Sequence, residues 1–248
     1  MGILLSGDTH RDFDTAKLVR SALHDAVGDA LKGVTHLVVL GDWGAIWSDS
    51  PASIAEERRM LAFYNAMDWE TLVILGNHEG YDRIERLQWT TRYSAPVRQV
   101  SDKIFILQHG NVYTVAGQRL FVFGGGESLD RDRRIEGESW WRQEIPSQAD
   151  LERGLASLQA VGGEVDYVLT HTCPRPMADH MISVAPNEYK VGTWTGKGLD
   201  VTVTMLTGLE AHLKPHKGWY FGHYHVDHSW GNYHCLYHKV VLIGEGAS

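Results

Sequence analysis

Residues 71–79 read TLVILGNHE, a short apolar run followed by a glycine and three polar residues. A run rich in apolar and β-branched side chains predicts a buried strand, and the glycine marks the point where the strand gives way to a loop. The same pattern occurs twice nearer the N-terminus, as ILLSGD at residues 3–8 and HLVVLGD at residues 36–42. Three buried strands that each end in a polar loop indicate an α/β fold.

Helical segments separate and follow these strands. Ser53 with Glu56 three residues later has the form of a capping box that opens a helix ending near Met67. The expected helices share apolar side chains at helical spacing, and they cover residues 14–32, 53–67, 147–160 and 201–213. Because the chain length is within the range of one folding unit, we expect a single domain over residues 1–248.

The second half of the chain predicts more strands. Short alternating runs between residues 103 and 123 are broken by glycine-containing turns, which predicts an antiparallel meander. Residues 165–170 form another apolar run, and residues 219–243 are strand-like with a turn at Gly222. Together with the first three strands, these segments imply a mixed sheet.

The composition narrows the class of protein. A chain of 248 residues with 43% hydrophobic residues is long enough to bury a large core. No apolar run approaches the roughly 20 residues that a membrane-spanning helix needs, so we expect a cytoplasmic protein. The net charge of -8 argues against a protein that tracks a long nucleic-acid backbone. Cys173 and Cys235 are expected to be free thiols, with one disulfide as the alternative.

Polar side chains that suit divalent cations follow five of the expected strands. Open α/β sheets place ligand groups in the loops just past the carboxyl ends of their strands. Aspartate, asparagine and neutral histidine are suitable ligands, and a shared carboxylate can bridge two ions. The loops contain Asp8-Thr9-His10, Gly41-Asp42, Gly76-Asn77-His78-Glu79, Thr170-His171-Thr172 and Gly222-His223-Tyr224-His225. Turn chemistry alone does not explain five such clusters, and we predict a metal site.

The order D-x-H, G-D, G-N-H-E, H, G-H-x-H resembles the calcineurin-like metallophosphoesterase superfamily, and it spans Asp8 to His225. A run at residues 124–144 is similar to one in small bacterial and phage members. The resemblance implies a four-layer α/β/β/α sandwich of two mixed sheets, with two metals in loops at the strand ends. It also implies a hydrolase of phosphoric esters, in which hydroxide held between the metals attacks phosphorus.

The resemblance further implies a ligand set for each metal. One metal would take Asp8, His10, Asp42 and His225. The other would take Asp42, Asn77, His171 and His223, so that Asp42 bridges the pair. His78 would not bind metal but would stabilise charge on a phosphoryl oxygen or protonate the leaving group. Mn²⁺, Fe²⁺/Fe³⁺ or Zn²⁺ suits so many imidazole ligands better than Mg²⁺ does.

The segment after the glycines at 124–126 has two interpretations. It is either a solvated charged loop or a device that brings polar side chains to the mouth of the site, where a guanidinium would hold a phosphate. On the second interpretation, the substrate-binding candidates are Asn77, Ser128, Asp130 and Arg134. Residues 180–197 likewise form either a long polar loop or a substrate lid.

Aromatic and acidic residues near the motifs also keep two interpretations. Trp43 and Trp47 either pack in the core or form an apolar wall for a nucleobase or aryl group. Glu79 either supports the ligands or caps a short helix that begins near Gly80. No role is assigned to Trp140, Trp141 and Glu144, which follow the charged segment.

The expected activity is hydrolysis of a small phosphomonoester or phosphodiester. Asp42 is followed by Trp43 rather than by the Arg-Gly stretch of phosphoprotein phosphatases, which argues against a protein Ser/Thr phosphatase. A nuclease is the first alternative, although the basic cluster at residues 131–134 is interrupted and surrounded by acidic residues. A non-catalytic, metal-bound scaffold for a protein partner is the second, and the intact His78 argues against it. The oligomeric state stays open.

Overall fold

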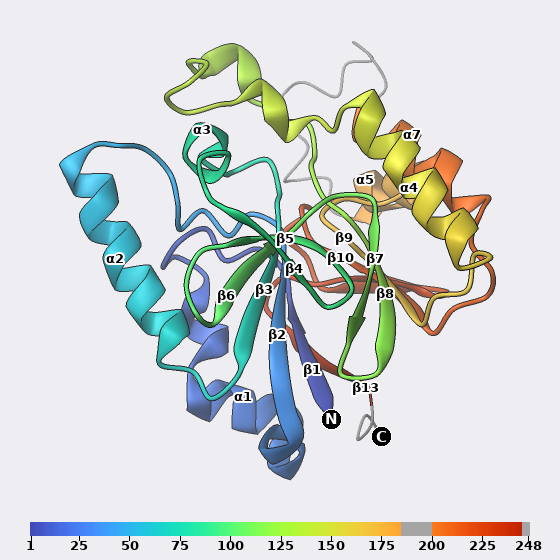
Figure 1. The fold of residues 1–248 in the computed structure, drawn as a ribbon, viewed down its shortest axis with the longest axis horizontal. Helices are drawn as coiled ribbons and strands as arrows, with labels where there is room; N and C mark the ends of the chain where they lie inside the picture. The colour runs from blue at the N-terminus through green and yellow to red at the C-terminus, as the bar shows by residue number, and fades with distance from the viewer. Residues whose placement is uncertain (185–199, 245–248) are drawn as a thin grey trace.

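The computed structural model describes residues 1–184 and 200–244, which form two mixed sheets (Figure 1). Sheet A has the strand order β13-β1-β2-β3-β6-β5-β4, with β1 (Gly2–Ser6), β2 (Val34–Leu40), β3 (Glu70–Ile74), β4 (Trp89–Arg92), β5 (Ala95–Gln99), β6 (Ile104–Leu107) and β13 (Val240–Gly244). Sheet B has the order β11-β12-β10-β9-β8-β7, with β7 (Asn111–Val115), β8 (Gln118–Phe123), β9 (Tyr167–Thr170), β10 (Gly218–Phe221), β11 (His228–Trp230) and β12 (Tyr233–Cys235).

Both sheets have parallel centres and antiparallel edges. In sheet A, β1, β2, β3 and β6 pair in parallel, whereas β13 and the β4–β5 hairpin join by antiparallel pairing. In sheet B, β8, β9, β10 and β12 pair in parallel, and β7 and β11 are antiparallel edge strands. The carboxyl ends of the parallel strands therefore meet at one end of each sheet, where ligand-carrying loops are expected.

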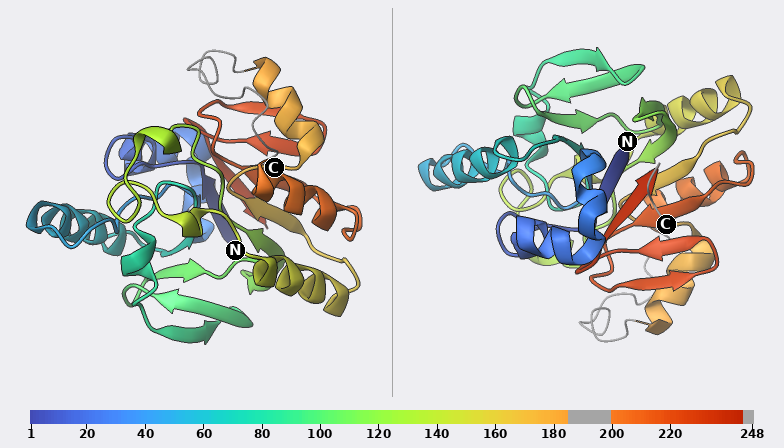
Figure 2. Two further views of the ribbon diagram at one scale, coloured as in Figure 1. Left: turned by 90° about the horizontal axis from the view of Figure 1, so that it is seen from above. Right: turned by 90° about the horizontal axis from the view of Figure 1, so that it is seen from below.

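The central strands of both sheets carry apolar side chains on both faces. One face packs against the other sheet, and the opposite face packs against helices. Ile3 and Leu5 of β1 pack between the sheets, whereas Leu4 faces the outer helices. Helices α1 (Arg20–Val27) and α2 (Pro51–Asn65) contribute to the outer core of sheet A. Sheet B is covered by α4 (Gln148–Ala160), α5 (Arg175–Val184) and α7 (Val201–Glu210). Figure 2 shows the two sets of helices on opposite outer sides, which confirms the expected four-layer α/β/β/α sandwich.

Two predictions about the first helices are wrong. Residues 14–32 do not form one helix, because Val19 is extended and Gly28 has a φ of 57°, so α1 lies between 3-10 turns. The capping box expected at Ser53 is also absent. Helix α2 begins at Pro51, and the hydroxyl of Ser50 accepts the hydrogen bond from the backbone N–H of Ser53. Proline is favoured at a first helical position, since it has no N–H to leave unpaired there.

The meander expected between residues 103 and 123 is wrong as well. Strand β6 lies parallel to β3 in sheet A, and only β7 and β8 form an antiparallel hairpin, in sheet B. The turn at residues 108–110 carries the chain from one sheet to the other. Alternating apolar residues identify strands but not the sheet that each strand joins, because both sheets bury the same kind of face.

Three further sequence predictions concern the remaining parts of the chain. Cys173 and Cys235 are free and buried, as expected. Among the residues that the structure describes, no helix is both long enough and apolar enough to cross a membrane. The loop or lid expected at residues 180–197 is wrong for residues 180–184, which are the end of helix α5, and residues 185–197 lie outside the described residues.

Candidate metal centre

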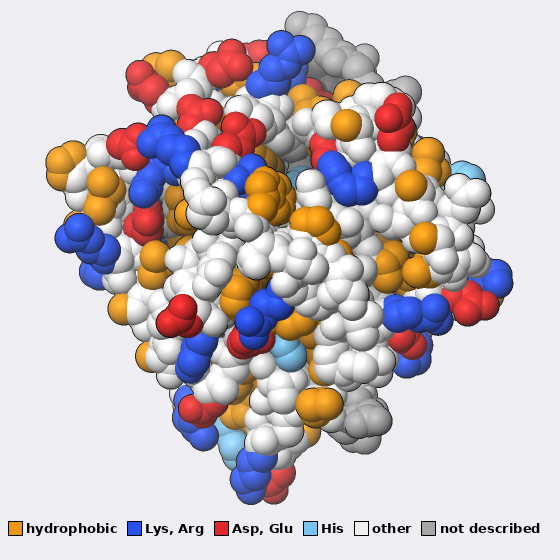
Figure 3. All heavy atoms as spheres, viewed as in Figure 1, with side chains coloured by type: hydrophobic (Ala, Val, Ile, Leu, Met, Phe, Trp, Pro, Cys, Tyr) orange, Lys and Arg blue, Asp and Glu red, His pale blue; other side chains and the backbone are white. Residues whose placement is uncertain are grey.

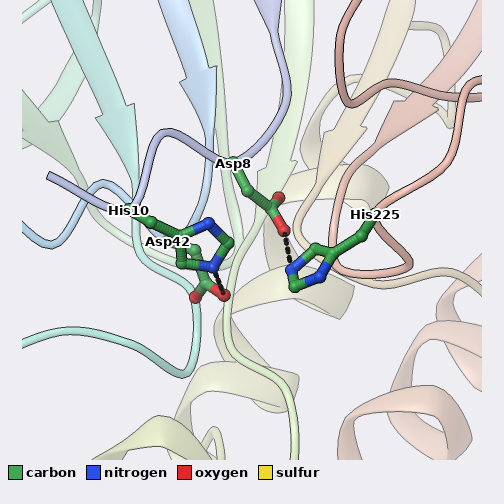
Figure 4. A group of neighbouring side chains, drawn as sticks. All are labelled: Asp8, His10, Asp42 and His225. Atoms are coloured by element: carbon green, nitrogen blue, oxygen red, sulfur yellow. Dashed lines mark ion pairs between the residues drawn. The ribbon is translucent and has the colours of Figure 1, made fainter. Parts of the chain in front are cut away.

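Four polar side chains converge where strands β1, β2 and β10 end. Asp8 and His10 follow β1, Asp42 follows β2 and His225 follows β10. One ligand-type atom from each residue lies within 4.8 Å of those of the others, and Figure 4 shows the four side chains gathered around one point. We call these residues the first group. It is the ligand set that the family resemblance implied for one metal.

A second group lies beside the first and shares Asp42. The Nε2 atom of His171 is 2.9 Å from Oδ1 of Asn77 and 3.3 Å from Oδ1 of Asp42. The same atom is 3.2 Å from Nδ1 of His223. The second group therefore comprises Asp42, Asn77, His171 and His223. The structure brings all seven predicted ligands together from the ends of five strands.

Hydrogen bonds orient the lone pairs of the second group toward one another. Nδ1 of His171 lies 2.9 Å from the carbonyl oxygen of Leu40, which can only accept, so the neutral ring carries its proton there. The amide nitrogen of Asn77 donates to Oγ of Ser128 at 3.2 Å, which leaves Oδ1 facing the ring. Nε2 of His171 and Oδ1 of Asn77 then face each other as two hydrogen-bond acceptors with no hydrogen between them, and their lone pairs repel. A cation between them would remove that repulsion. This donor set therefore fits a metal ion.

Both carboxylates of the centre are fully buried. Oδ1 of Asp8 accepts the backbone N–H of His223 at 2.9 Å, and Oδ2 lies 3.2 Å from Nε2 of His225. Oδ1 of Asp42 accepts the backbone N–H of His78 at 2.8 Å. Burial favours the neutral acid, but the surrounding histidines hold the pKa of Asp42 well below its usual range. Ionised carboxylates this deep need nearby positive charge, which bound cations would supply.

One histidine of each group has a strongly shifted pKa, and the two shifts have opposite directions. Burial, and then the neighbouring His171, lowers the pKa of His223 to about 3, so its ring is neutral and able to bind a metal. Burial also disfavours a charged His10, but Asp42 and Asp8 raise its pKa to about 9. A cation in the first group must displace that proton, so metal binding there releases a proton near neutral pH.

Three glycines at the strand ends leave room for the candidate ligands. A Cβ atom added at any of them would lie 2.1 Å from a ligand-type side chain of a neighbouring loop. The pairs are Gly41 with His171, Gly76 with Asp42, and Gly222 with Asp8. The glycine in each of the G-D, G-N-H-E and G-H-x-H motifs is thus required by the close approach of two loops.

Four candidate ligands have a left-handed backbone conformation. Non-glycine residues rarely adopt it, and they do so mostly where the surrounding structure holds them for a function. The φ values are 42° for His10, 48° for Asp42, 69° for His223 and 48° for His225. The backbone strain is concentrated in the loops that carry the candidate ligands.

The family comparison agrees with this geometry. The model of the calcineurin-like phosphoesterases matches residues 1–227. The chain belongs to this family. A comparison with curated proteins finds no match. The phosphoesterase is therefore a hydrolase that acts on phosphoric ester bonds, and its family uses two divalent metal ions, which the buried cluster of the first group fits.

His78 of the phosphoesterase lies beside the first group without joining either group. Its Nδ1 accepts a hydrogen bond from Nη1 of Arg134 at 3.2 Å, so the neutral ring carries its proton on Nε2. Burial lowers the pKa of His78, although Asp42 opposes the shift. Nε of Arg134 donates to Asp130 at 2.6 Å, and Nη1 donates to the carbonyl oxygen of Ser139 at 3.0 Å. These two contacts hold the guanidinium beside His78.

Ser128 of the phosphoesterase lies behind Asn77. Its hydroxyl donates to Oε2 of Glu144 at 2.7 Å, and its backbone N–H donates to Oε1 at 2.7 Å. The same hydroxyl accepts the amide hydrogen of Asn77. Burial raises the pKa of Glu144 to about 7. The buried chain of hydrogen bonds from Asn77 through Ser128 to Glu144 therefore fixes the orientation of the Asn77 amide, with Oδ1 facing the second group.

Glu79 and Trp43 of the phosphoesterase are fully buried residues of the loops that follow β3 and β2. The carboxylate of Glu79 accepts the backbone N–H groups of Trp43 at 2.8 Å and Gly44 at 2.9 Å, so it joins the loops that follow β2 and β3. Helix α3 (Tyr81–Ile84) has no side-chain cap, and the capping interpretation of Glu79 is wrong. Trp43 is fully buried against Tyr64, as in the packing interpretation.

A pocket of about 500 Å³ opens beside the first group of the phosphoesterase. His78 and Arg134 lie on its wall together with Arg11, Phe13, Trp47 and Tyr237. Three of these residues, Arg11, Phe13 and Tyr237, are not among the site residues predicted from the sequence. Arg11 and Phe13 come within three residues of the D-x-H motif, and this position is the feature of the sequence that could have identified them as pocket residues. Tyr237 had no signal, because only the fold brings its loop to the site.

Proposed function

We propose that the chain hydrolyses a small phosphomonoester or phosphodiester at these seven residues. The observation that supports the proposal most directly is the convergence of two donor groups on the shared carboxylate of Asp42. In this assignment, the first group holds one cation and the second group holds the other, with Mn²⁺, iron or Zn²⁺ as the fitting ions. When bound, the cations supply positive charge for the phosphoryl oxygens and an activated water.

His78 and Arg134 are proposed to act on the reacting ester. Because Arg134 donates to Nδ1, the proton on Nε2 of His78 is available for a phosphoryl oxygen or for the leaving oxygen. The guanidinium of Arg134 offers further N–H donors to a phosphate. Asp130 and Ser128 have supporting positions, since Asp130 orients Arg134 and Ser128 orients Asn77.

The surface favours a small substrate over a long nucleic acid. Arg131 and Arg134, in the only dense basic cluster of the sequence, are paired with Glu127 and Asp130. On the face shown in Figure 3, basic and acidic side chains are interspersed and form no continuous basic stripe. A nuclease needs such a stripe to neutralise the phosphates of its substrate. The cytoplasmic location and the single domain remain predictions from the sequence.

The test uses metal-stripped protein with Mn²⁺ added back, and p-nitrophenyl phosphate and bis-p-nitrophenyl phosphate as substrates. We expect metal-dependent turnover of at least one ester. The His78→Ala variant should lose activity by about 10²- to 10³-fold while it still binds two Mn²⁺ ions, because the ring contributes to proton transfer and not to metal binding.

His212→Ala is the matched control, because this exposed histidine follows α7 away from the centre. It should retain the wild-type rate. Two bound Mn²⁺ ions with no turnover of either ester, or turnover that His78→Ala leaves unchanged, would contradict the proposal. The first of these outcomes is what a non-catalytic scaffold predicts.

A further inference from the structure

The pocket beside the first group has a wall that the chemistry of phosphate ester hydrolysis does not require. Phe13 is 81% exposed at its rim, which is unusual for a large apolar ring. Trp47 lines the pocket and is held edge-on against buried Trp141, with ring centroids 5.0 Å apart. Tyr237 lines it from the other end of the chain. Three aromatic rings therefore surround a space next to the metal centre.

Two of these rings, Trp47 and Tyr237, are held in place by contacts with charged and polar groups. The guanidinium of Arg11 lies 4.8 Å from the ring centroid of Trp47, and its Nη1 donates to Glu56 at 3.0 Å. The hydroxyl of Tyr237 donates to Asp14 at 3.2 Å, and its ring stacks on His225 at 4.9 Å. Two fixed rings and one stacked guanidinium recognise flat groups, because they offer π faces at little cost in side-chain entropy, and the exposed ring of Phe13 adds a further apolar face at the rim.

The position of this wall relates it to one part of the substrate. His78 and Arg134, which are proposed to contact the phosphate, lie on the same pocket as Phe13 and Trp47. A phosphate held beside His78 thus leaves the organic part of the ester facing the rings. A volume of about 500 Å³ is within the range of pockets for small ligands and holds one ring system and one sugar, not a duplex.

We propose that the organic group of the substrate is a planar ring, as in a nucleoside or an aryl group, and that Phe13 and Trp47 bind it. This inference rests on the proposed function, since it assigns the phosphate to His78 and Arg134. The substrate class is inferred from the side chains of the pocket wall and not from the metal centre. Esters with only a sugar or an alkyl group lack the flat face that the wall recognises.

The test compares two probes that differ only by the base. Adenosine 5′-monophosphate and ribose 5-phosphate are titrated into the Mn²⁺-loaded His78→Ala variant, which is expected to keep both ions but to hydrolyse esters too slowly to consume the probes, and their dissociation constants are measured by calorimetry. We expect the nucleotide to bind about tenfold more tightly, since stacking of one base on aromatic side chains has an effect of this order. Phenyl phosphate and glycerol phosphate form a second pair, so that tighter binding of the nucleotide or of phenyl phosphate identifies the kind of ring.

The variants Phe13→Ala and Trp47→Ala should abolish the preference without weakening ribose 5-phosphate. Phe13 is so exposed that its replacement leaves the core intact, which keeps the test valid if Trp47→Ala fails to fold. Trp89→Ala is the matched control. Trp89 is 48% exposed on β4 and carries a similar stack, with Arg98 at 4.1 Å, but it does not line the pocket.

Equal affinity for the two members of both pairs would overturn the proposal, as would a preference that survives in both pocket variants. Because binding is measured, this result is independent of turnover. Ester hydrolysis with no ring preference contradicts only the pocket assignment. A ring preference without hydrolysis contradicts only the proposed function.

Discussion

The two groups of the centre share Asp42 but differ in access and in charge. The first group has a second carboxylate, Asp8, and its histidines lie along the pocket. The side chains of His10 and His225 are 20% and 31% exposed. A site with two carboxylates and an open side attracts a cation strongly and exchanges it with solvent.

The second group is enclosed and has one carboxylate. The side chain of His171 is fully buried, and Asn77 is held from behind by Ser128 and Glu144. Its ligand atoms are oriented by hydrogen bonds before any cation arrives. We therefore expect charge to dominate cation affinity in the first group, and prior orientation of the ligands to dominate it in the second.

The largest effect is expected at the residue that the groups share. Asp42→Ala should reduce binding from two Mn²⁺ ions per chain to one or none, because both groups lose their common carboxylate. Hydrolysis should fall by about 10⁴-fold or more, since both cations act on the reacting ester. Metal content after desalting and the initial rate are the measurements.

Asp179→Ala, which removes an exposed carboxylate on α5, is the control and should keep two ions. If Asp42→Ala kept two ions at wild-type affinity, the groups would be independent and the bridging assignment would be wrong.

An intermediate effect is expected at Ser128, which touches only the second group. Ser128→Ala removes the hydrogen bond that orients Asn77, so Mn²⁺ affinity should fall by roughly 10- to 100-fold for one of the two ions. The other ion should bind as in the wild type. A two-step titration followed by the paramagnetic resonance of free Mn²⁺ separates the two affinities.

Ser183→Ala serves as the matched control, since this exposed serine donates to the carbonyl oxygen of His180 within α5 and is not part of either group. An equal loss of affinity for both ions would show that the groups do not respond separately.

The smallest effect concerns Glu144 and pH, in metal-stripped protein. Burial raises the pKa of Glu144 to about 7, above its ordinary value of 4.5. The neutral acid is thus favoured in the folded state, and this stabilisation is complete below pH 4.5 and is lost as pH rises through 7. Relative to Glu144→Gln, the wild type should lose on the order of 2 kcal/mol of unfolding free energy between pH 5 and pH 8.

Denaturant unfolding of both proteins at several pH values measures this difference, and the titrations of other groups cancel in it. A difference that stays constant, or that grows with pH, would mean that Glu144 is ionised in the fold. The second group would then be oriented by a charge rather than by a neutral network.

Much of this architecture was predictable from short patterns. Strands β1, β2 and β3 and all seven converging side chains follow from apolar runs that end in glycine and polar residues. The reason is physical, because parallel strands buried on both faces have few alternatives and their ends must meet at one edge. The family resemblance supplied the division into two ligand sets.

The rest depends on contacts between distant segments. The pattern of β6 does not say that it joins sheet A, since that depends on its pairing with β3. Nothing local to Ser128 shows that it lies behind Asn77, and nothing local to Tyr237 places it beside His225. Side chains that support a site from another loop become visible only when the tertiary packing is known.

Strand β13 is the last strand of the described chain, and it pairs along the whole length of β1, the first. Asp8 and His10 follow β1 within a few residues, whereas His223 and His225 come near the other end of the chain. During synthesis, the ribosome therefore releases three residues of the first group and two of the second early, and the remaining residues of each group late. With the proposed ligand sets, the nascent chain holds neither ion with all of its ligands until the loop after β10 has emerged, so capture of the ions would be a late step of folding.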